Sequence, residues 1–246
     1  MTRRNRKVIE NLFSVAENIS ERKYSTKQIE GLPEPVQKYF KYSLTNDQHI
    51  ISYVRLIHGG KFKPKDSWVK IRGEEYFTVE KPGFVWLGRT SMFSASDSYI
   101  DGVGNLQVKL LSIIKLVDEK GDKLNQGELL RWLGEAPLFP TALLPSENLR
   151  WESIDDESAR VIFTNNNLTV EGIFFFNEKG QIIKFTAKRY KDAELEDWTG
   201  YYDNYRKINN LRIPFKMKVE WNLASGNLEY VDFDIETIEF NIPEKF

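Results

Sequence analysis

Two charged residues stand four positions apart where the most apolar segment of the chain begins. Arg131 and Glu135 belong to RWLGEAPLFPTALLP, residues 131–145, in which no charged residue follows Glu135. Side chains at positions i and i+4 of a helix are neighbours, so this arginine and glutamate can pair. A buried charge must be paired, because leaving it alone is costly. The spacing predicts either an internal salt bridge, with a strand arginine such as Arg189 as a further partner, or a polar clamp beside an apolar pocket.

Other acidic residues offer weaker candidates for chemistry. Asp97 and Asp101 lie four apart in a turn-rich segment, and paired carboxylates can carry out acid–base catalysis. Turn formation explains both residues more simply. A second acidic cluster, residues 155–157, lacks the ligand spacing of a calcium loop and is expected to form a solvated turn.

Metal and cofactor sites are not expected. The chain has two histidines, His49 and His58, whose odd offset places them on opposite faces of a regular strand. We therefore interpret both as ordinary polar residues. DGVGN, residues 101–105, lacks the third glycine and the helix of a dinucleotide fingerprint, so it is predicted to be a turn. With no cysteine in the chain, disulfides, thiolate zinc sites and cysteine nucleophiles are excluded.

The composition describes a folded chain with no strong bias toward a charged partner. Of its 246 residues, 41% are hydrophobic and 29% are charged, while the net charge is −1. Basic residues alternate with acidic ones, so nucleic-acid binding is not expected. Aromatic residues reach 13%, and such side chains suit sheet faces.

Three helices are expected. The first, over residues 6–22, has a narrow apolar stripe that follows a basic start, which indicates a helix docked on the domain or a weak membrane-surface contact through residues 3–19. We expect no signal peptide, no transmembrane segment and a cytoplasmic location, or membrane association if a natural N-terminal segment is missing. A second helix is expected within residues 31–44. A third is expected over 126–136, with Asn125 and Glu128 forming a capping-box-like start.

Period-two patterns predict about ten strands at hairpin spacing. No alternation of strands and helices appears, which argues against a parallel sheet. The fold class is therefore α+β, with a large curved antiparallel sheet, an unclosed β-barrel, wrapped over a few helices. Residues 1–30 are expected to form a peripheral helix and residues 31–246 a single domain. The apolar segment 129–145, broken by prolines, is expected to fill the concave side of the sheet. The strand ranges are 50–58, 67–80, 83–91, 105–118, 159–163, 168–176, 181–190, 198–207, 211–223 and 228–240.

Five segments resemble a bacterial family of uncharacterised domains. The most specific match is R-[aromatic]-L-x-E followed by P-T-A-L-L-P, within residues 128–145. That family's pattern is in turn loosely similar to the lipoprotein-localisation-factor fold, an unclosed β-barrel whose apolar cavity holds acyl chains. The resemblance implies a similar fold and an apolar cavity, but fold does not give function. The matching segments are 32–44, 74–89, 97–111, 128–145 and 197–221.

The leading hypothesis is a non-enzymatic domain that binds an apolar or lipid-like ligand in the concavity of the sheet. One alternative is an enzyme on an apolar substrate that uses Asp97, Asp101 or Glu135 as acid or base. Another is a protein-interaction module whose cavity is filled by its own side chains. The oligomeric state stays open. The residues expected to contact the ligand are Arg131, Trp132, Leu133, Glu135, Leu138, Phe139, Leu143 and Leu144.

Overall fold

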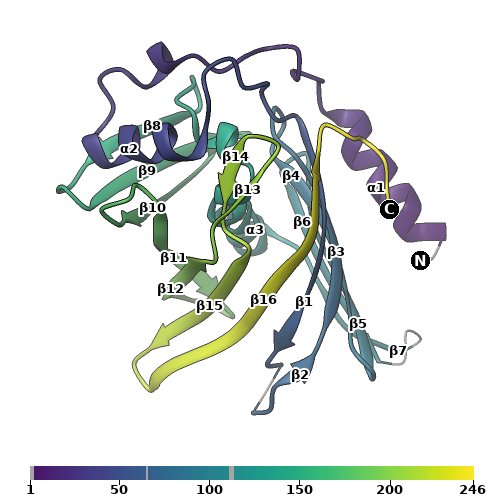
Figure 1. Cartoon of the computed structure of the whole chain (residues 1–246). Helices are drawn as coiled ribbons and strands as arrows, with labels where there is room; N and C mark the ends of the chain where they lie inside the picture. The colour runs from purple at the N-terminus through teal and green to yellow at the C-terminus, as the bar shows by residue number, and fades with distance from the viewer. Residues whose placement is uncertain (1–2, 65, 111–113) are drawn as a thin grey trace.

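One curved antiparallel sheet dominates the computed structural model, which describes residues 3–64, 66–110 and 114–246 (Figure 1). The sheet curls through 274° into an open half-barrel. The fold class expected from the sequence is confirmed. In spatial order the strands are β7 (Ile114–Glu119), β6 (Val103–Leu110), β5 (Phe93–Ile100), β4 (Gly83–Arg89), β3 (Arg72–Thr78), β1 (Tyr53–Phe62), β16 (Gly226–Phe240), β15 (Lys216–Leu223), β12 (Glu194–Asp203), β11 (Ile182–Lys191), β10 (Leu168–Phe176), β9 (Ser158–Asn165) and β8 (Leu149–Ser153).

The sheet consists of two half-sheets that follow each other in the sequence. Strands β1 to β7 form the first half, and strands β8 to β12 with β15 and β16 form the second. The halves meet where β1 pairs with β16, with Val54 opposite Phe240 and Phe62 opposite Val231. The short β2 (Val69–Lys70) extends the end of β1, while β13 (Arg206–Ile208) and β14 (Leu211–Ile213) form a separate hairpin.

The described residues contain more strands than the sequence patterns predicted. Within residues 67–80 and 211–223 the chain forms two short strands where one was expected. Residues 97–100, expected to belong to a turn-rich segment, are the second half of β5, which pairs with both β4 and β6. The single strand expected over 105–118 is a hairpin of β6 and β7. Residues 111–113, which lie between these two strands in the sequence, are outside the described residues.

Between the half-sheets the chain forms α3 (Asp122–Glu135), followed by the 3-10 turns η2 (Ala136–Leu138) and η3 (Pro140–Leu143). Pro137 and Pro140 each stand in the first two positions of a 3-10 turn, where a missing N–H costs little. The expected broken helix is confirmed, and we call residues 129–144 the plug.

The expected capping box of α3 is wrong. The helix begins at Asp122, one turn earlier than expected, and its N-cap is Gly121 at φ 119°. The Asn125 side chain instead accepts a hydrogen bond from the backbone N–H of Gly104 at 2.8 Å. This asparagine therefore attaches α3 to β6.

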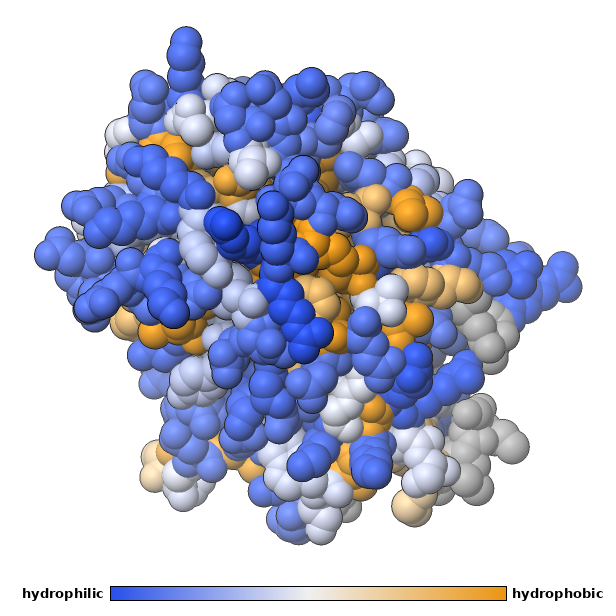
Figure 2. Space-filling model, viewed as in Figure 1, coloured by the Kyte–Doolittle hydropathy of each residue, from blue (hydrophilic) through white to orange (hydrophobic). Residues whose placement is uncertain are grey.

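The plug lies on the concave side of the sheet and forms the centre of the core (Figure 1). Phe139 is fully buried, with its ring 4.8 Å from Phe77 and 5.7 Å from Trp132. Side-chain hydrogen bonds fix the plug to its surroundings. Trp132 Nε1 donates to the Thr78 carbonyl at 3.0 Å, and Trp151 Nε1 donates to the Leu143 carbonyl at 3.0 Å. The face seen in Figure 2 is mostly hydrophilic, with a hydrophobic area near its centre. Most large apolar side chains of the described residues are buried.

The N-terminal helix α1 (Arg3–Val15) packs on the convex side of the first half-sheet, apart from the main core (Figure 1). Its buried residues Ile9, Leu12 and Phe13 contact a small apolar group on β1, β3 and β4. The helix ends earlier than expected, and beyond it the N–H of Ile19 donates to Ser52 Oγ at 2.8 Å.

The helix α2 (Glu34–Ser43) and the 3-10 turn η1 (Thr26–Ile29) add Val36, Tyr39, Phe40 and Ile29 to the main core. The prolines expected in the first turn of α2 stand at its N-cap and at its second residue. None of the described helices is both long enough and apolar enough to span a bilayer.

Candidate functional site

Arg131 lies at the centre of a buried group of charges. Its Nη2 is 2.7 Å from Glu75 Oε1 on β3, and its Nη1 is 2.7 Å from Asp97 Oδ2 on β5. Its Nε is 3.2 Å from Glu135 Oε1, one turn along α3. The guanidinium uses three nitrogens on three carboxylates, which is the geometry that makes arginine suited to buried ion pairs. The expected pair of Arg131 and Glu135 is therefore present, within a larger cluster.

A second arginine reaches α3 from the other half-sheet. Arg189 Nη2 on β11 is 3.3 Å from Glu128 Oε1, whose side chain is 1% exposed. Gly127 makes room for it, because a Cβ there would lie 3.0 Å from Arg189 Nε. Arg189 was expected to join the pair of Arg131 and Glu135, but it pairs with Glu128, about two turns earlier on α3 than Glu135. We call these six residues the charge cluster: Arg131, Arg189, Glu75, Asp97, Glu128 and Glu135.

The charge cluster holds more acids than bases. Four carboxylates face two guanidinium groups, which leaves two excess negative charges if every group is ionised. Burial penalises the charged form of a carboxyl. It raises the pKa of Glu128 to about 8 and raises the pKa of Glu75 well above its usual range. Burial also raises the pKa of Glu135. The cluster therefore retains protons at neutral pH.

Retained protons also supply hydrogen-bond donors that the cluster otherwise lacks. Asp97 Oδ1, Glu128 Oε2 and Glu135 Oε2 are buried and accept no hydrogen bond from another group. The neighbouring Asp97 carboxyl contributes to the raised pKa of Glu128, and that of Glu135 contributes to the raised pKa of Glu75. One proton on Glu75 and one on Glu128 would bridge both carboxyl pairs. These two protons would also cancel the two excess negative charges.

Aromatic rings cover the Arg131 side of the charge cluster. The guanidinium carbon lies 4.6 Å from the Phe84 ring centre and 5.4 Å from that of Trp86, within the range of a cation–π contact. Trp86 Nε1 donates to His58 Nε2 at 2.8 Å, and the His58 ring stacks on Phe233 at 4.0 Å. The expectation that His58 is an ordinary polar residue is wrong, because it is 1% exposed. Burial lowers its pKa to about 4, so the ring is neutral and accepts the tryptophan hydrogen bond.

A second row of rings extends from Arg189 toward solvent. Arg189 lies over Trp198 at 5.2 Å, and Trp198 Nε1 donates to Tyr230 Oη at 2.9 Å. Tyr230 stacks on Trp221 at 6.2 Å and meets Phe62 at 6.4 Å. The outermost of these rings are only partly buried, although they pack against the main core. Phe93 of β5 meets Phe62 at 6.3 Å. We call this set the aromatic face: Phe62, Phe93, Trp221, Tyr230 and Phe233.

Every residue expected to contact a ligand lies on the concave side of the sheet. The six apolar ones are almost fully buried, since Leu144, the most exposed of them, is 7% exposed. The side chains of Arg131 and Glu135 are each 14% exposed. The structure therefore brings together the predicted set, but closes its apolar part off from solvent.

The other acidic candidates do not join this site. Asp101 occupies the turn between β5 and β6 at φ 51°, so the structure separates it from Asp97. Asp155 caps its own turn by accepting hydrogen bonds from the N–H of Glu157 and the hydroxyl of Ser158, as expected for a solvated turn. Within residues 3–64, 66–110 and 114–246, no group of three or more histidine, cysteine or acidic residues has the arrangement of a metal site.

Sequence reasoning missed Glu75, Glu128, His58 and Trp86 as members of the site. Only the Glu75 signal was visible. Glu75 shares one face of a predicted strand with Phe77, and a charged residue on the inward face requires a partner. Glu128 was read as a capping residue, and nothing in the sequence places His58 beside Trp86.

These features define a class of protein: an open antiparallel half-barrel that encloses its own helical plug and pairs that plug with inward-facing charges. The chain belongs to the family described as Family of unknown function (DUF6544), whose sequence model matches residues 22–233. The expected membership of an uncharacterised family is thus confirmed. No curated protein matches the chain by sequence.

Solved structures show a loose likeness of fold. A LolA-superfamily protein from Nitrosomonas europaea is 12% identical, with a TM-score of 0.47, and the match covers 85% of this chain and 92% of that one. A DUF1329-family protein from Desulfovibrio piger is 10% identical, with a TM-score of 0.43, and the match covers 98% of this chain and 95% of that one. At these values the likeness carries no information about a ligand.

Proposed function

We propose that the chain is a non-enzymatic binding protein that holds an apolar, lipid-like ligand against its aromatic face. The observation that carries this proposal is the partial exposure of rings that continue the main core on its concave side. Ligand sites are concave, largely apolar surfaces with a few placed polar groups. The aromatic face meets this description at its inner end, where Trp198 and Tyr230 share a hydrogen bond.

In this proposal the plug forms the closed end of the site. Leu133, Leu138 and Phe139 are buried from solvent, so a ligand on the aromatic face meets the Arg131 and Glu135 side of α3 first. The remaining apolar side chains of the plug would contact a ligand only after a shift of α3. Such a shift would break the ion pairs of the charge cluster.

The state of the charge cluster favours a neutral ligand. With two of its carboxyls protonated, the two remaining carboxylates would balance its two arginines, so the inner end of the site would offer no uncompensated charge to a charged head group. The aromatic rings in front of it would favour an apolar body through burial of surface. We therefore expect a neutral, apolar molecule rather than a fatty-acid anion.

The test combines native mass spectrometry and solvent extraction of the purified protein with titration of a neutral fluorescent apolar probe. We expect a retained or bound molecule at defined stoichiometry. Tyr230→Ala should weaken probe binding about tenfold, which is the loss of roughly one aromatic contact and its burial. Tyr201→Ala is the matched control, because this tyrosine of β12 is 38% exposed and its hydroxyl donates to Glu220.

An empty protein that binds no probe would contradict the proposal and favour the interaction module, whose cavity is filled by the plug. Equal probe affinity of the two tyrosine variants would place the binding site elsewhere.

One observation favours the enzyme as a second candidate. A carboxyl whose pKa is about 8, as at Glu128, can donate a proton near neutral pH. In that case a ligand extracted from the protein would be converted on incubation with the wild type and not with Glu128→Gln. Unchanged ligand in both incubations would exclude this role for Glu128.

A further inference from the structure

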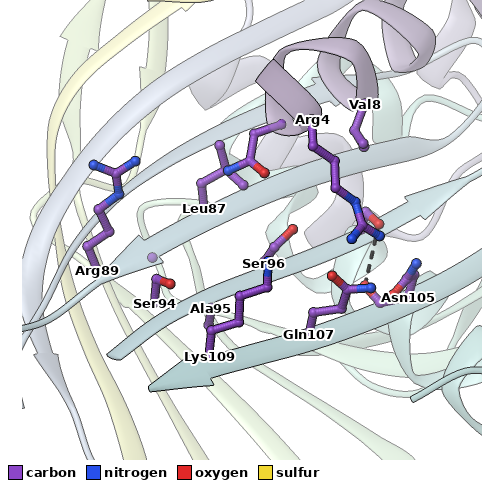
Figure 3. Close-up of a pocket in the computed structure, with 13 residues that line it drawn as sticks. Arg4, Val8, Leu87, Arg89, Ser94, Ala95, Ser96, Asn105, Gln107 and Lys109 are labelled. Atoms are coloured by element: carbon purple, nitrogen blue, oxygen red, sulfur yellow. Dashed lines mark hydrogen bonds between the residues drawn. The ribbon is translucent and has the colours of Figure 1, made fainter. Parts of the chain in front are cut away.

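A hollow lies on the opposite side of the sheet from the aromatic face, between α1 and the convex surface of β4, β5 and β6 (Figure 3). Its volume is about 110 Å³. That is small beside the roughly 300–1,000 Å³ of sites for drug-sized ligands. The hollow therefore suits a compact chemical group rather than a whole cofactor or an acyl chain.

Three cationic side chains from three elements surround this hollow. Arg4 comes from α1, Arg89 ends β4, and Lys109 stands near the end of β6. In Figure 3, Arg4 extends from the helix toward the strands that carry the other two. The elements are brought together by the apolar contacts of α1, so the three charges are positioned by the fold.

Neutral hydrogen-bonding groups fill the spaces between the cations. Alternate residues of β5 place Ser94, Ser96 and Ser98 on this side of the sheet, because successive side chains of a strand point to opposite faces. Asn105 and Gln107 of β6 face the same hollow. Hydroxyl and amide groups of this kind can donate hydrogen bonds to oxygen atoms of a bound group.

Carboxylates are nearly absent from this place, although the chain as a whole has a net charge of −1. None of the residues that line the hollow is acidic. Asp118 of β7 contacts one of the lining side chains: its Oδ1 accepts a hydrogen bond from Gln107 Nε2 at 3.0 Å. Within the described ranges, Arg4, Arg89 and Lys109 take part in no ion pair.

This pattern differs from that of three other basic residues on the sheet. Lys188 lies 2.8 Å from Asp197, Arg72 lies 2.9 Å from Glu236, and Lys216 lies 2.8 Å from Asp232. Three unpaired cations around one hollow repel one another unless an anion lies between them. The arrangement therefore favours a small group with several negatively charged oxygens.

We propose that this hollow binds a phosphate group, with Arg4, Arg89 and Lys109 as its cationic partners and Ser96 of β5 as a hydroxyl donor. Arginine is well matched to phosphate, because its planar fork can donate two parallel hydrogen bonds. The site is separate from the apolar site proposed above, and neither depends on the other.

Two sources supply such a group: a soluble phosphomonoester and the head group of an anionic phospholipid. A shallower basic surface adjoins the hollow through Arg4 and Val8, and Arg3, Lys7 and Asn11 complete it. Basic side chains next to a phosphate site would also contact an anionic bilayer. The experiment must therefore present both forms.

The experiment measures binding of the full chain to two kinds of probe. Isothermal titration uses inorganic phosphate and glycerol 3-phosphate. Flotation uses vesicles of phosphatidylcholine with and without phosphatidic acid. The test variant is Arg4→Gln/Arg89→Gln, and Lys109→Gln is a second, single variant. The matched control is Arg150→Gln/Lys188→Gln, which removes the same charge from exposed residues on the other half-sheet.

We expect the double variant to weaken binding about tenfold or more, as expected for losing charge-assisted hydrogen bonds to phosphate, and the control to bind like the wild type. Binding of soluble esters alone would identify a free phosphomonoester as the source. Binding confined to vesicles that contain phosphatidic acid would identify a lipid head group. The proposal is overturned if no probe binds, or if the test and control variants bind with the same affinity.

Discussion

Arg131 on α3 and Glu75 on β3 are 56 positions apart, yet their side chains meet at 2.7 Å between Nη2 and Oε1. This contact joins the helix to the first half-sheet. The contact between Arg189 and Glu128 joins the same helix to the second half-sheet. The charge cluster therefore connects α3 to both halves of the fold.

Replacement of Arg131 by methionine should lower the free energy of unfolding by about 3–5 kcal/mol, because Glu75, Asp97 and Glu135 lose their shared buried cation. Urea denaturation at pH 7 measures the change. Arg150→Met, at an arginine whose side chain is 66% exposed, is the control and should change stability by less than about 0.5 kcal/mol. Equal stability of the two variants would contradict a cohesive role for the charge cluster.

Replacement of Phe139 by alanine should lower the free energy of unfolding by about 3–5 kcal/mol, the usual range for a buried phenylalanine. Its ring is fully buried against Phe77 and Trp132, so its removal leaves a cavity in the centre of the plug. Thermal or urea unfolding measures the loss, with Met92→Ala at a 62% exposed position as the control. A loss below about 1 kcal/mol would mean that the plug is not part of the stable core.

Stability should fall as the pH rises from about 6.5 to above 8. The folded protein raises the pKa of Glu128 from 4.5 to about 8, so its stabilising contribution is complete below pH 4.5 and lost as the pH passes through 8. Glu75 and Glu135 act in the same direction. His58, whose pKa is lowered from 6.5 to about 4, acts in the opposite direction only below pH 6.5. Urea unfolding at steps of pH measures the slope.

Glu128→Gln provides the control for this pH dependence. An amide resembles the protonated carboxyl and cannot ionise. The fall of the unfolding free energy with pH between 6.5 and 8 should therefore become shallower by up to about 1.4 kcal/mol per pH unit. Glu178→Gln, at an exposed glutamate in the turn before β11, should leave the slope unchanged. A wild-type stability that does not vary in this range would show that the cluster holds no extra protons.

Replacement of Leu12 by alanine should loosen α1 without loosening α3. Leu12 is fully buried, but it belongs to the small convex-side cluster and not to the main core. Hydrogen exchange should therefore become faster in residues 3–15 and stay unchanged in residues 122–135, since separately packed units open separately. Faster exchange in both helices would mean that α1 and the main core open as one unit, against the expected peripheral status of residues 1–30.

The fold was predictable where the patterns were long and regular. Alternation over residues 168–176 matches β10 with the same bounds, and the prolines at 137 and 140 break the plug where expected. The polar strand β5 was missed because its outward positions are serines and its inward ones include Asp97. In β5, the hydrogen bonding to two neighbouring strands decides the structure against the polar composition.

Only the contacts between residues close in the sequence could be predicted for the site. The pair of Arg131 and Glu135 is a local pattern, and the structure contains it. Glu75 and Asp97 join it through sheet curvature, which no local pattern encodes. Arg189 was named for the wrong partner for the same reason, because its distance from each acid depends on how far the second half-sheet curls over α3.

The pairing of β1 with β16 also has a consequence for synthesis. This contact links the first strand of the chain to the last, and the rest of the sheet is two sequence-local meanders. A growing chain on the ribosome can form each meander early, but it cannot join them until residues 226–240 have left the exit tunnel. Contacts of such long sequence separation slow folding. Until the last strand emerges, the edge of β1 and the partly covered plug are exposed together, so the nascent chain depends on rapid completion or on a chaperone to avoid aggregation.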